Sequence, residues 1–149
     1  MELVHKVNKL IILTLISMLT AAVGMGRAKH ETQTEATESE QVARGRYIVE
    51  GVAKCEQCHT RRMENGEPDL GNWLKGGPVQ IEPTYPARHW AVKVPRIAGG
   101  PPGTDADFIR LMTTGIARTG KPPDPPMPQF HMTREDAEAV LAYLKTLAP

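Results

Sequence analysis

Two cysteines and a histidine stand close together in the segment Cys55-Glu56-Gln57-Cys58-His59. Thiols three positions apart can each form a thioether with a vinyl group of the same porphyrin. A histidine directly after the second thiol can then bind the iron of that porphyrin as an axial ligand. The segment therefore predicts covalent attachment of one c-type haem through Cys55 and Cys58, with His59 as the proximal ligand.

Two other kinds of site use the same spacing of cysteines. A thioredoxin-like dithiol stands in a βαβ context, and no alternating strand pattern surrounds this segment. A zinc site needs four ligands, and neither a second cysteine pair nor a His-x₃₋₅-His sequence follows. The chain has two cysteines in all, so haem attachment would leave no thiol for a disulfide.

The composition favours one small helical domain. With two Trp, three Tyr and two Phe among 149 residues, a flat apolar cofactor would supply much of the core. The 13 glycines and 13 prolines are concentrated between Gly66 and Pro128, which indicates helices at both ends and an irregular middle. The net charge of +1 gives no indication of nucleic acid as a partner. The sequence also shows no catalytic triad, paired carboxylates or phosphate-binding loop.

The first 28 residues have the pattern of an export signal. Lys6 and Lys9 precede the apolar run at residues 10–23, and small residues follow it. At about 1.5 Å per helical residue, this run is shorter than the roughly 30 Å hydrocarbon core of a membrane. We therefore expect a cleaved signal peptide at residues 1–28; the alternative is an uncleaved anchor through residues 10–24.

A polar segment separates this signal from the folded part. Residues 29–40 are acidic and almost without apolar side chains, so we expect a disordered leader. The folded domain is expected at residues 41–149 and begins with a helix that runs into the cysteine segment. Gly45 within that helix costs about 1 kcal/mol relative to alanine, which predicts the close approach of another helix.

Two further helices are predicted downstream. Residues 104–114 and 133–147 each start with a threonine N-cap, and Gly115 ends the first of them. An apolar stripe runs along the last helix. Tyr143 flanks that stripe, and we expect it to lie over Gly45.

The region between the cysteine segment and these helices is expected to form loops. Apolar side chains there that could wall a haem are Trp73, Tyr85, Trp90 and Ile97.

The sixth position of a haem iron decides between electron transfer and ligand chemistry. The candidate ligands downstream are Met63, His89, Met112, Met127, His131 and Met132. Met127 stands in the proline-rich segment 121–128, where prolines fix φ near −65° and stiffen the loop. We expect Met127 to be the second axial ligand, and His131 is the leading nitrogen alternative.

Residues 43–147 resemble a class I cytochrome c of the bacterial monohaem type. Residues 45–49 before the cysteine segment and residues 126–128 before the last helix carry the resemblance. It implies an all-α fold, the small class I cytochrome c fold, in which the first and last helices cross and a loop-rich middle surrounds one haem. It also implies that His59 and Met127 bind opposite faces of the iron.

The resemblance also implies a carbonyl that accepts the Nδ1–H of His59, and Pro68 is similar to the proline of that motif. The similarity is greatest to cytochrome subunits of periplasmic dehydrogenases. It implies a periplasmic one-electron carrier with one covalently bound haem c. The redox partner would be a dehydrogenase, an oxidase or another cytochrome. Membrane attachment would need the N-terminal segment to be retained.

Two alternatives share the haem but differ in role. One is a small haem enzyme or gas sensor with an exchangeable sixth ligand, for which Arg88 and His89 are the nearest distal pair. The other is a dedicated cytochrome subunit of a dehydrogenase complex. In either electron-transfer reading we expect a mildly basic docking face. Its predicted members are Lys54, Arg61, Arg62, Arg118 and Lys121, against Glu56 and Asp124.

Overall fold

A computed structural model describes residues 37–86 and 89–149 of the chain. The predicted signal peptide and residues 29–36 of the predicted leader lie outside the described residues. The chain forms two units, and all the named elements below lie in the second, Glu40–Pro149. Residues 37–40 are helical, which differs from the disorder predicted for the leader, because a helix once nucleated extends at little cost.

The first helical segment changes its winding before the cysteines. Residues 37–46 are α-helical and continue into the π-helix η1 (Tyr47–Val52), which buries Ile48 and Val49. A short helix, α2 (Glu56–His59), follows and carries the cysteine segment. Nothing in the sequence predicted the wider turns of η1, which occur mostly as short insertions in α-helices.

The two downstream helices confirm the predictions to within a residue at each end. They are α3 (Asp105–Thr114) and α4 (Arg134–Thr146). Thr104 and Thr133 cap them by accepting backbone hydrogen bonds from Asp107 and Asp136. Gly115 ends α3 with φ 70°, in the left-handed region that favours glycine.

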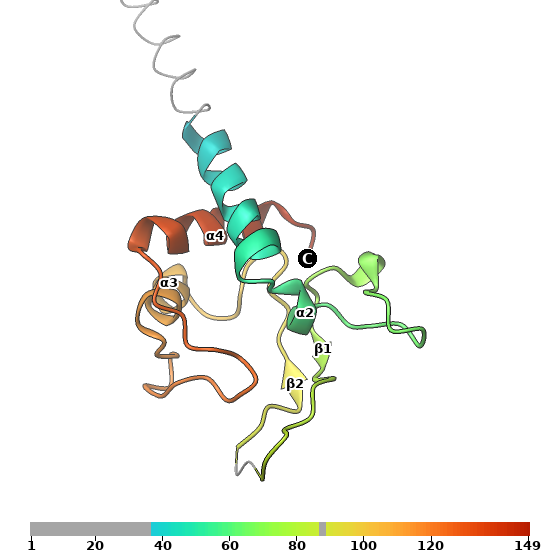
Figure 1. The fold of residues 1–149 in the computed structure, drawn as a ribbon. Coiled ribbons are helices and arrows are strands. Elements are labelled where there is room, and N and C mark those ends of the chain that lie inside the picture. Colours follow the sequence, from blue (N-terminus) through green and yellow to red (C-terminus); the bar gives the residue numbers. More distant parts are fainter. Residues whose placement is uncertain (1–36, 87–88) are drawn as a thin grey trace, which may run out of the picture. The chain divides into compact units, whose positions relative to one another are not determined.

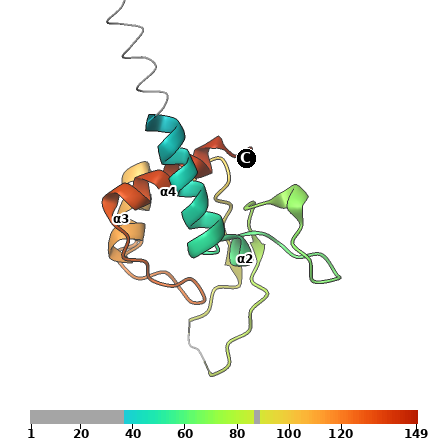
Figure 2. The ribbon, with the colours of Figure 1, turned by 45° about the horizontal axis from the view of Figure 1, so that its top comes forward.

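The first helical segment crosses α4 (Figures 1 and 2). Gly45 lies at this contact, as predicted. A Cβ added to Gly45 would overlap the carbonyl group of Ala139 and lie 2.9 Å from the Cβ of Tyr143. Arg44 Nε bonds to Asp136 at 2.9 Å, and Tyr143 donates its hydroxyl to Glu50 Oε1 at 2.5 Å. Bare backbone at Gly45 therefore lets the two helices approach closely, and polar pairs fix their crossing.

The middle of the domain is mostly irregular, as predicted, but it includes three short elements. They are the 3₁₀ turn η2 (Leu70–Asn72) and the antiparallel strands β1 (Gly77–Pro78) and β2 (Lys93–Val94). The strands start a hairpin that the sequence did not predict, since glycine and proline occupy the first strand.

One apolar core joins η1, α3 and α4. Its largest buried side chains are Ile48, Val49, Leu74, Ile97, Phe108, Met112, Val140, Leu141, Tyr143 and Leu144. The helix-rich architecture with crossed terminal helices agrees with the small all-α fold that the resemblance implies. Within residues 37–86 and 89–149, no helix is long and apolar enough to span a membrane.

Candidate haem site

A cavity of about 350 Å³ lies among α2, β2, α3 and the proline-rich loop. Cys55, Cys58, His59 and Met127, the four residues predicted to hold a haem, all contribute to its lining. Most of the other lining side chains are apolar, among them Phe108, Leu111, Val140 and Leu144. The volume lies in the range of pockets that bind cofactors.

Two atoms of His59 form hydrogen bonds with the loop-rich middle of the domain. Its Nδ1 lies 2.8 Å from the carbonyl oxygen of Pro95, and its own carbonyl accepts the N–H of Gly76 at 2.8 Å. A carbonyl can only accept, so Nδ1 carries the proton and Nε2 keeps a free lone pair. Burial lowers the pKa of His59, which favours the neutral imidazole that binds metals.

The partner of His59 corrects one prediction. Pro68, which the resemblance suggested, pairs through its backbone with Arg62 in an isolated bridge. Pro95, which lies 36 positions from His59, takes the expected role. The intervening chain forms η2 and the hairpin, and it folds back to return Pro95 to α2. Distance along the sequence was therefore a poor guide to this contact.

The cysteines do not have the character of a reactive dithiol. Burial raises the pKa of the Cys55 thiol to about 11, and burial also raises the pKa of Cys58. A redox-active Cys-x-x-Cys pair depends instead on a lowered pKa, which supplies the nucleophilic thiolate. Among the described residues, no three His, Cys, Asp or Glu side chains lie close enough together to hold a metal ion.

The candidate sixth ligands differ in whether they line the cavity. Three methionines line it, Met112, Met127 and Met132. Met112 is a buried core residue of α3, and the backbone N–H of Met132 donates to its carbonyl at 2.9 Å. The remaining candidates, Met63, His89 and His131, are exposed and do not line the cavity.

The proline-rich loop is held against the hairpin. The N–H of Ala91 donates to the carbonyl of Pro125 at 2.7 Å. Pro126 and Pro128, on either side of Met127, both line the cavity. This loop therefore presents Met127 to the cavity on stiff backbone.

The prediction of which loop residues would wall a haem is mostly wrong. Of the four apolar loop residues proposed, Ile97 lines the cavity. Trp73 packs against the core, Tyr85 is exposed, and Trp90 donates its indole N–H to the carbonyl of Ile81 at 2.9 Å. The helices supply the wall in their place, through residues such as Phe108 and Leu111 of α3.

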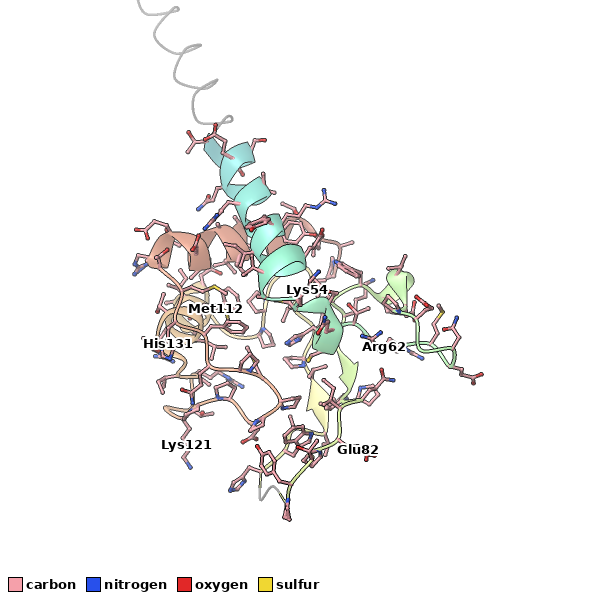
Figure 3. All side chains as sticks on the ribbon, in the orientation of Figure 1. Lys54, Arg62, Glu82, Met112, Lys121 and His131 are labelled. Carbon is pink, nitrogen blue, oxygen red and sulfur yellow. The ribbon has the colours of Figure 1, made fainter. Side chains whose placement is uncertain are left out.

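The charges around the cavity are mixed. Lys54 and Arg118, two of the predicted basic residues, line it together with Lys93, which the sequence analysis did not single out. Asp107 and Asp124 supply the acidic groups of the lining. Figure 3 shows Lys54 at the start of α2 and Lys121 on the proline-rich loop.

The remaining charges predicted for the docking face do not line the cavity. Arg61, Arg62 and Lys121 are exposed, and Arg61 Nε lies 3.7 Å from Asp69. One carboxylate oxygen of Glu56, between the two cysteines, is buried without a hydrogen-bond partner in the described part of the chain.

The donor set fits a covalently bound haem. It offers two thiols for thioethers, an imidazole with a free nitrogen, a thioether sulfur on a stiff loop, and apolar walls around them. The family model for cytochrome c matches residues 42–148. A stretch of 35 residues is 54% identical to part of a diheme cytochrome c-type protein of Cereibacter sphaeroides. That match covers 24% of this chain and 12% of the relative.

Proposed function

Since the chain belongs to the cytochrome c family, whose members transfer electrons through haem, we propose that it is an exported carrier of single electrons. The observation that carries the proposal is one cavity lined by Cys55, Cys58, His59 and Met127. A bound haem c would supply a one-electron Fe(III)/Fe(II) couple there.

Each of the four residues has a distinct task in this proposal. Cys55 and Cys58 would attach a haem through thioethers, and Nε2 of His59 would bind its iron. The bond to Pro95 fixes the tautomer and the ring orientation of His59 and increases its basicity. Met127 would supply the second ligand to the iron, and its soft sulfur would favour Fe(II) and so raise the reduction potential.

Most of the remaining lining of the cavity is apolar. Apolar side chains from α3 and α4 cover the site and disfavour the additional positive charge of the oxidised iron. Electron transfer needs only that one edge of the cofactor comes close to a partner, so no substrate pocket or general base is required.

The compartment, the number of haems and the partners belong to the same proposal. The predicted signal peptide at residues 1–28 supports export to the periplasm. The two cysteines of the sequence allow one haem, whereas the name of the relative describes a diheme protein. We propose a dehydrogenase, an oxidase or another cytochrome as redox partner, reached by a free carrier or within a dehydrogenase complex.

A haem enzyme or gas sensor with an open sixth position is the weaker candidate. His89 of the suggested distal pair is exposed and does not line the cavity. Arg88 lies outside the described residues.

Substitution of the axial methionine tests the proposed function. Met127→Ala, produced in a host that attaches haem c, should keep the covalent haem and lose the weak far-red band of thioether ligation to iron. It should also bind carbon monoxide and show a lower reduction potential. Met132→Ala is the matched control, because Met132 also lines the cavity. The ligand assignment would be refuted if Met127→Ala kept the band and the reduction potential of the parent, or if Met132→Ala lost the band.

A further inference from the structure

Thr60 directly follows His59 in the sequence and is 2% exposed. In the described part of the chain, these two neighbours are the only polar residues that are buried. The hydroxyl oxygen of Thr60 accepts the backbone N–H of Leu74 at 2.9 Å. This bond joins positions 14 residues apart, so the Thr60 side chain connects the end of α2 to the loop-rich middle of the domain.

Leu74 has an unusual backbone conformation. Its φ is 55°, in the left-handed region, and its side chain is fully buried. This conformation costs a residue other than glycine about 1–2 kcal/mol, and it persists only where the surrounding structure holds it. Besides the bond to Thr60, the carbonyl of Leu74 accepts the N–H groups of Ile97 and Ala98 at 2.9 and 3.1 Å. Both backbone polar groups of Leu74 are therefore bonded in the left-handed conformation.

Leu74 lies between Thr60 and the segment that contains the partner of His59. The carbonyl of Pro95 accepts the Nδ1–H of His59 at 2.8 Å. Ile97, which donates to Leu74, lies two positions after Pro95. The hydroxyl of Thr60 therefore anchors the backbone to which the Pro95 segment is bonded.

We propose that the hydroxyl of Thr60 is a positioning group for His59. Because it holds Leu74 in the left-handed conformation, it keeps the Pro95 carbonyl on Nδ1 of His59. This hydrogen bond makes the imidazole a stronger donor to a bound iron. A weaker bond would favour Fe(II), so loss of the hydroxyl should raise the reduction potential. The proposal rests on the proposed electron-transfer function and adds to it a residue that sets the potential.

Thr60→Val tests the proposal, because valine resembles threonine in shape but cannot accept a hydrogen bond. The N–H of Leu74 would then be buried without a partner, and we expect the Pro95 segment to move. In the haem-loaded, reduced protein, the Nδ1 proton of His59 should exchange with solvent about tenfold faster, as for loss of about one hydrogen bond. The reduction potential should rise. Proton NMR and potentiometric titration measure the two effects.

Two further substitutions at the same position isolate the hydroxyl. Thr60→Ser keeps the acceptor and should show the exchange rate and the potential of the parent. Thr60→Ala removes the acceptor without placing a methyl group against the N–H of Leu74, so it serves where the valine variant does not fold. It should shift both measurements in the same direction as Thr60→Val.

Thr133→Val is the matched control for a loss of stability. The Thr133 side chain also accepts a backbone N–H, that of Asp136 at 3.1 Å, and caps α4. Its replacement should lower the melting temperature but leave the exchange of the His59 proton and the reduction potential unchanged.

Three results would overturn the positioning role. One is the exchange rate and potential of the parent in Thr60→Val, or in Thr60→Ala where the valine variant does not fold. The second is a shift in Thr60→Ser as large as that in Thr60→Ala. The third is an equal shift in Thr133→Val, since loss of stability alone would then be sufficient. Absence of a reversible one-electron wave in the parent would instead refute the proposed function, and the exchange of the His59 proton would then decide the positioning role.

Discussion

The imidazole Nδ1 of His59 and the carbonyl oxygen of Pro95 lie 2.8 Å apart, and Gly76 holds this pair together. Gly76 donates its N–H to the carbonyl of His59, and its α-carbon faces the backbone of residues 94–96. A Cβ at this position would lie 2.6 Å from Val94 O and 2.7 Å from the carbonyl carbon of Pro95. Glycine therefore allows the middle segment to approach α2.

We expect Gly76→Ala to destabilise the haem-loaded protein by about 2–4 kcal/mol, because it combines a positive φ with overpacking against backbone. The displaced Pro95 carbonyl should bond more weakly to His59, and a less basic imidazole favours Fe(II). The reduction potential should therefore rise. Thermal unfolding and potentiometric titration measure the two effects.

Gly66→Ala is the control for the backbone conformation. Gly66 has φ +84°, close to the +76° of Gly76, but no atom lies within 4 Å of the position of its Cβ. Its substitution should cost about 1 kcal/mol and leave the potential unchanged. Equal potentials in both alanine variants would show that Gly76 does not act through Pro95.

Local sequence signals predicted the parts of this site that depend on neighbouring residues. Cys55, Cys58 and His59 share one helical turn, and Thr104 and Thr133 cap helices through side chains that reach only three positions. The helix contact at Gly45 was also predictable, because a glycine inside a helix is destabilising unless another element approaches it closely.

The parts that the sequence did not predict depend on long-range folding. Pro95 and Lys93 reach the cavity because the hairpin pairs in one register, and nothing near His59 encodes that register. Which residues line the walls of the cavity also depends on long-range folding. Aromatic residues of the loops were available to line it, but packing of α3 against α4 decided which side chains do.

The crossing at Gly45 gives a second prediction. Alanine in a helix is normally more stable than glycine by about 0.5–1 kcal/mol. At Gly45 we expect the opposite sign, a loss of about 1–3 kcal/mol, because the methyl group would meet the Ala139 carbonyl. The visible spectrum should stay unchanged. Gly51→Ala is the control, since its Cβ would meet only the ring of Tyr47 at 3.3 Å. Similar melting temperatures for both variants would contradict the tight crossing.

Tyr143 predicts a loss of stability at alkaline pH. Burial, followed by the hydrogen bond to Glu50, raises the pKa of Tyr143 to about 12, whereas an unfolded tyrosine titrates near 10. The folded protein therefore holds this proton more tightly, and the resulting stability is present below pH 10 and lost as the pH rises towards 12. Arg46, which also bonds to Glu50, opposes part of the shift.

Tyr143→Phe tests this relation. The variant should be less stable at neutral pH by about 1.5–3 kcal/mol, because a hydrogen bond to a charged group is lost. Its unfolding free energy in urea should then decline less than that of the parent between pH 10 and pH 12. Tyr47→Phe, at a position 60% exposed, should follow the parent throughout. Parallel pH profiles for Tyr143→Phe and the parent would exclude Tyr143 as the titrating group.

The carboxylate of Glu56 should lower the reduction potential. It lies between the two cysteines of α2, and one of its oxygens is buried without a partner in the described part of the chain. A negative charge there stabilises the more positive Fe(III) state. Glu56→Gln keeps the shape and removes the charge, so the potential should rise. An interaction of about 1 kcal/mol corresponds to roughly 40 mV for one electron.

Glu64→Gln removes the same charge from an exposed position and should leave the potential nearly unchanged. Equal potentials for the two glutamine variants would mean that the Glu56 charge does not reach the iron.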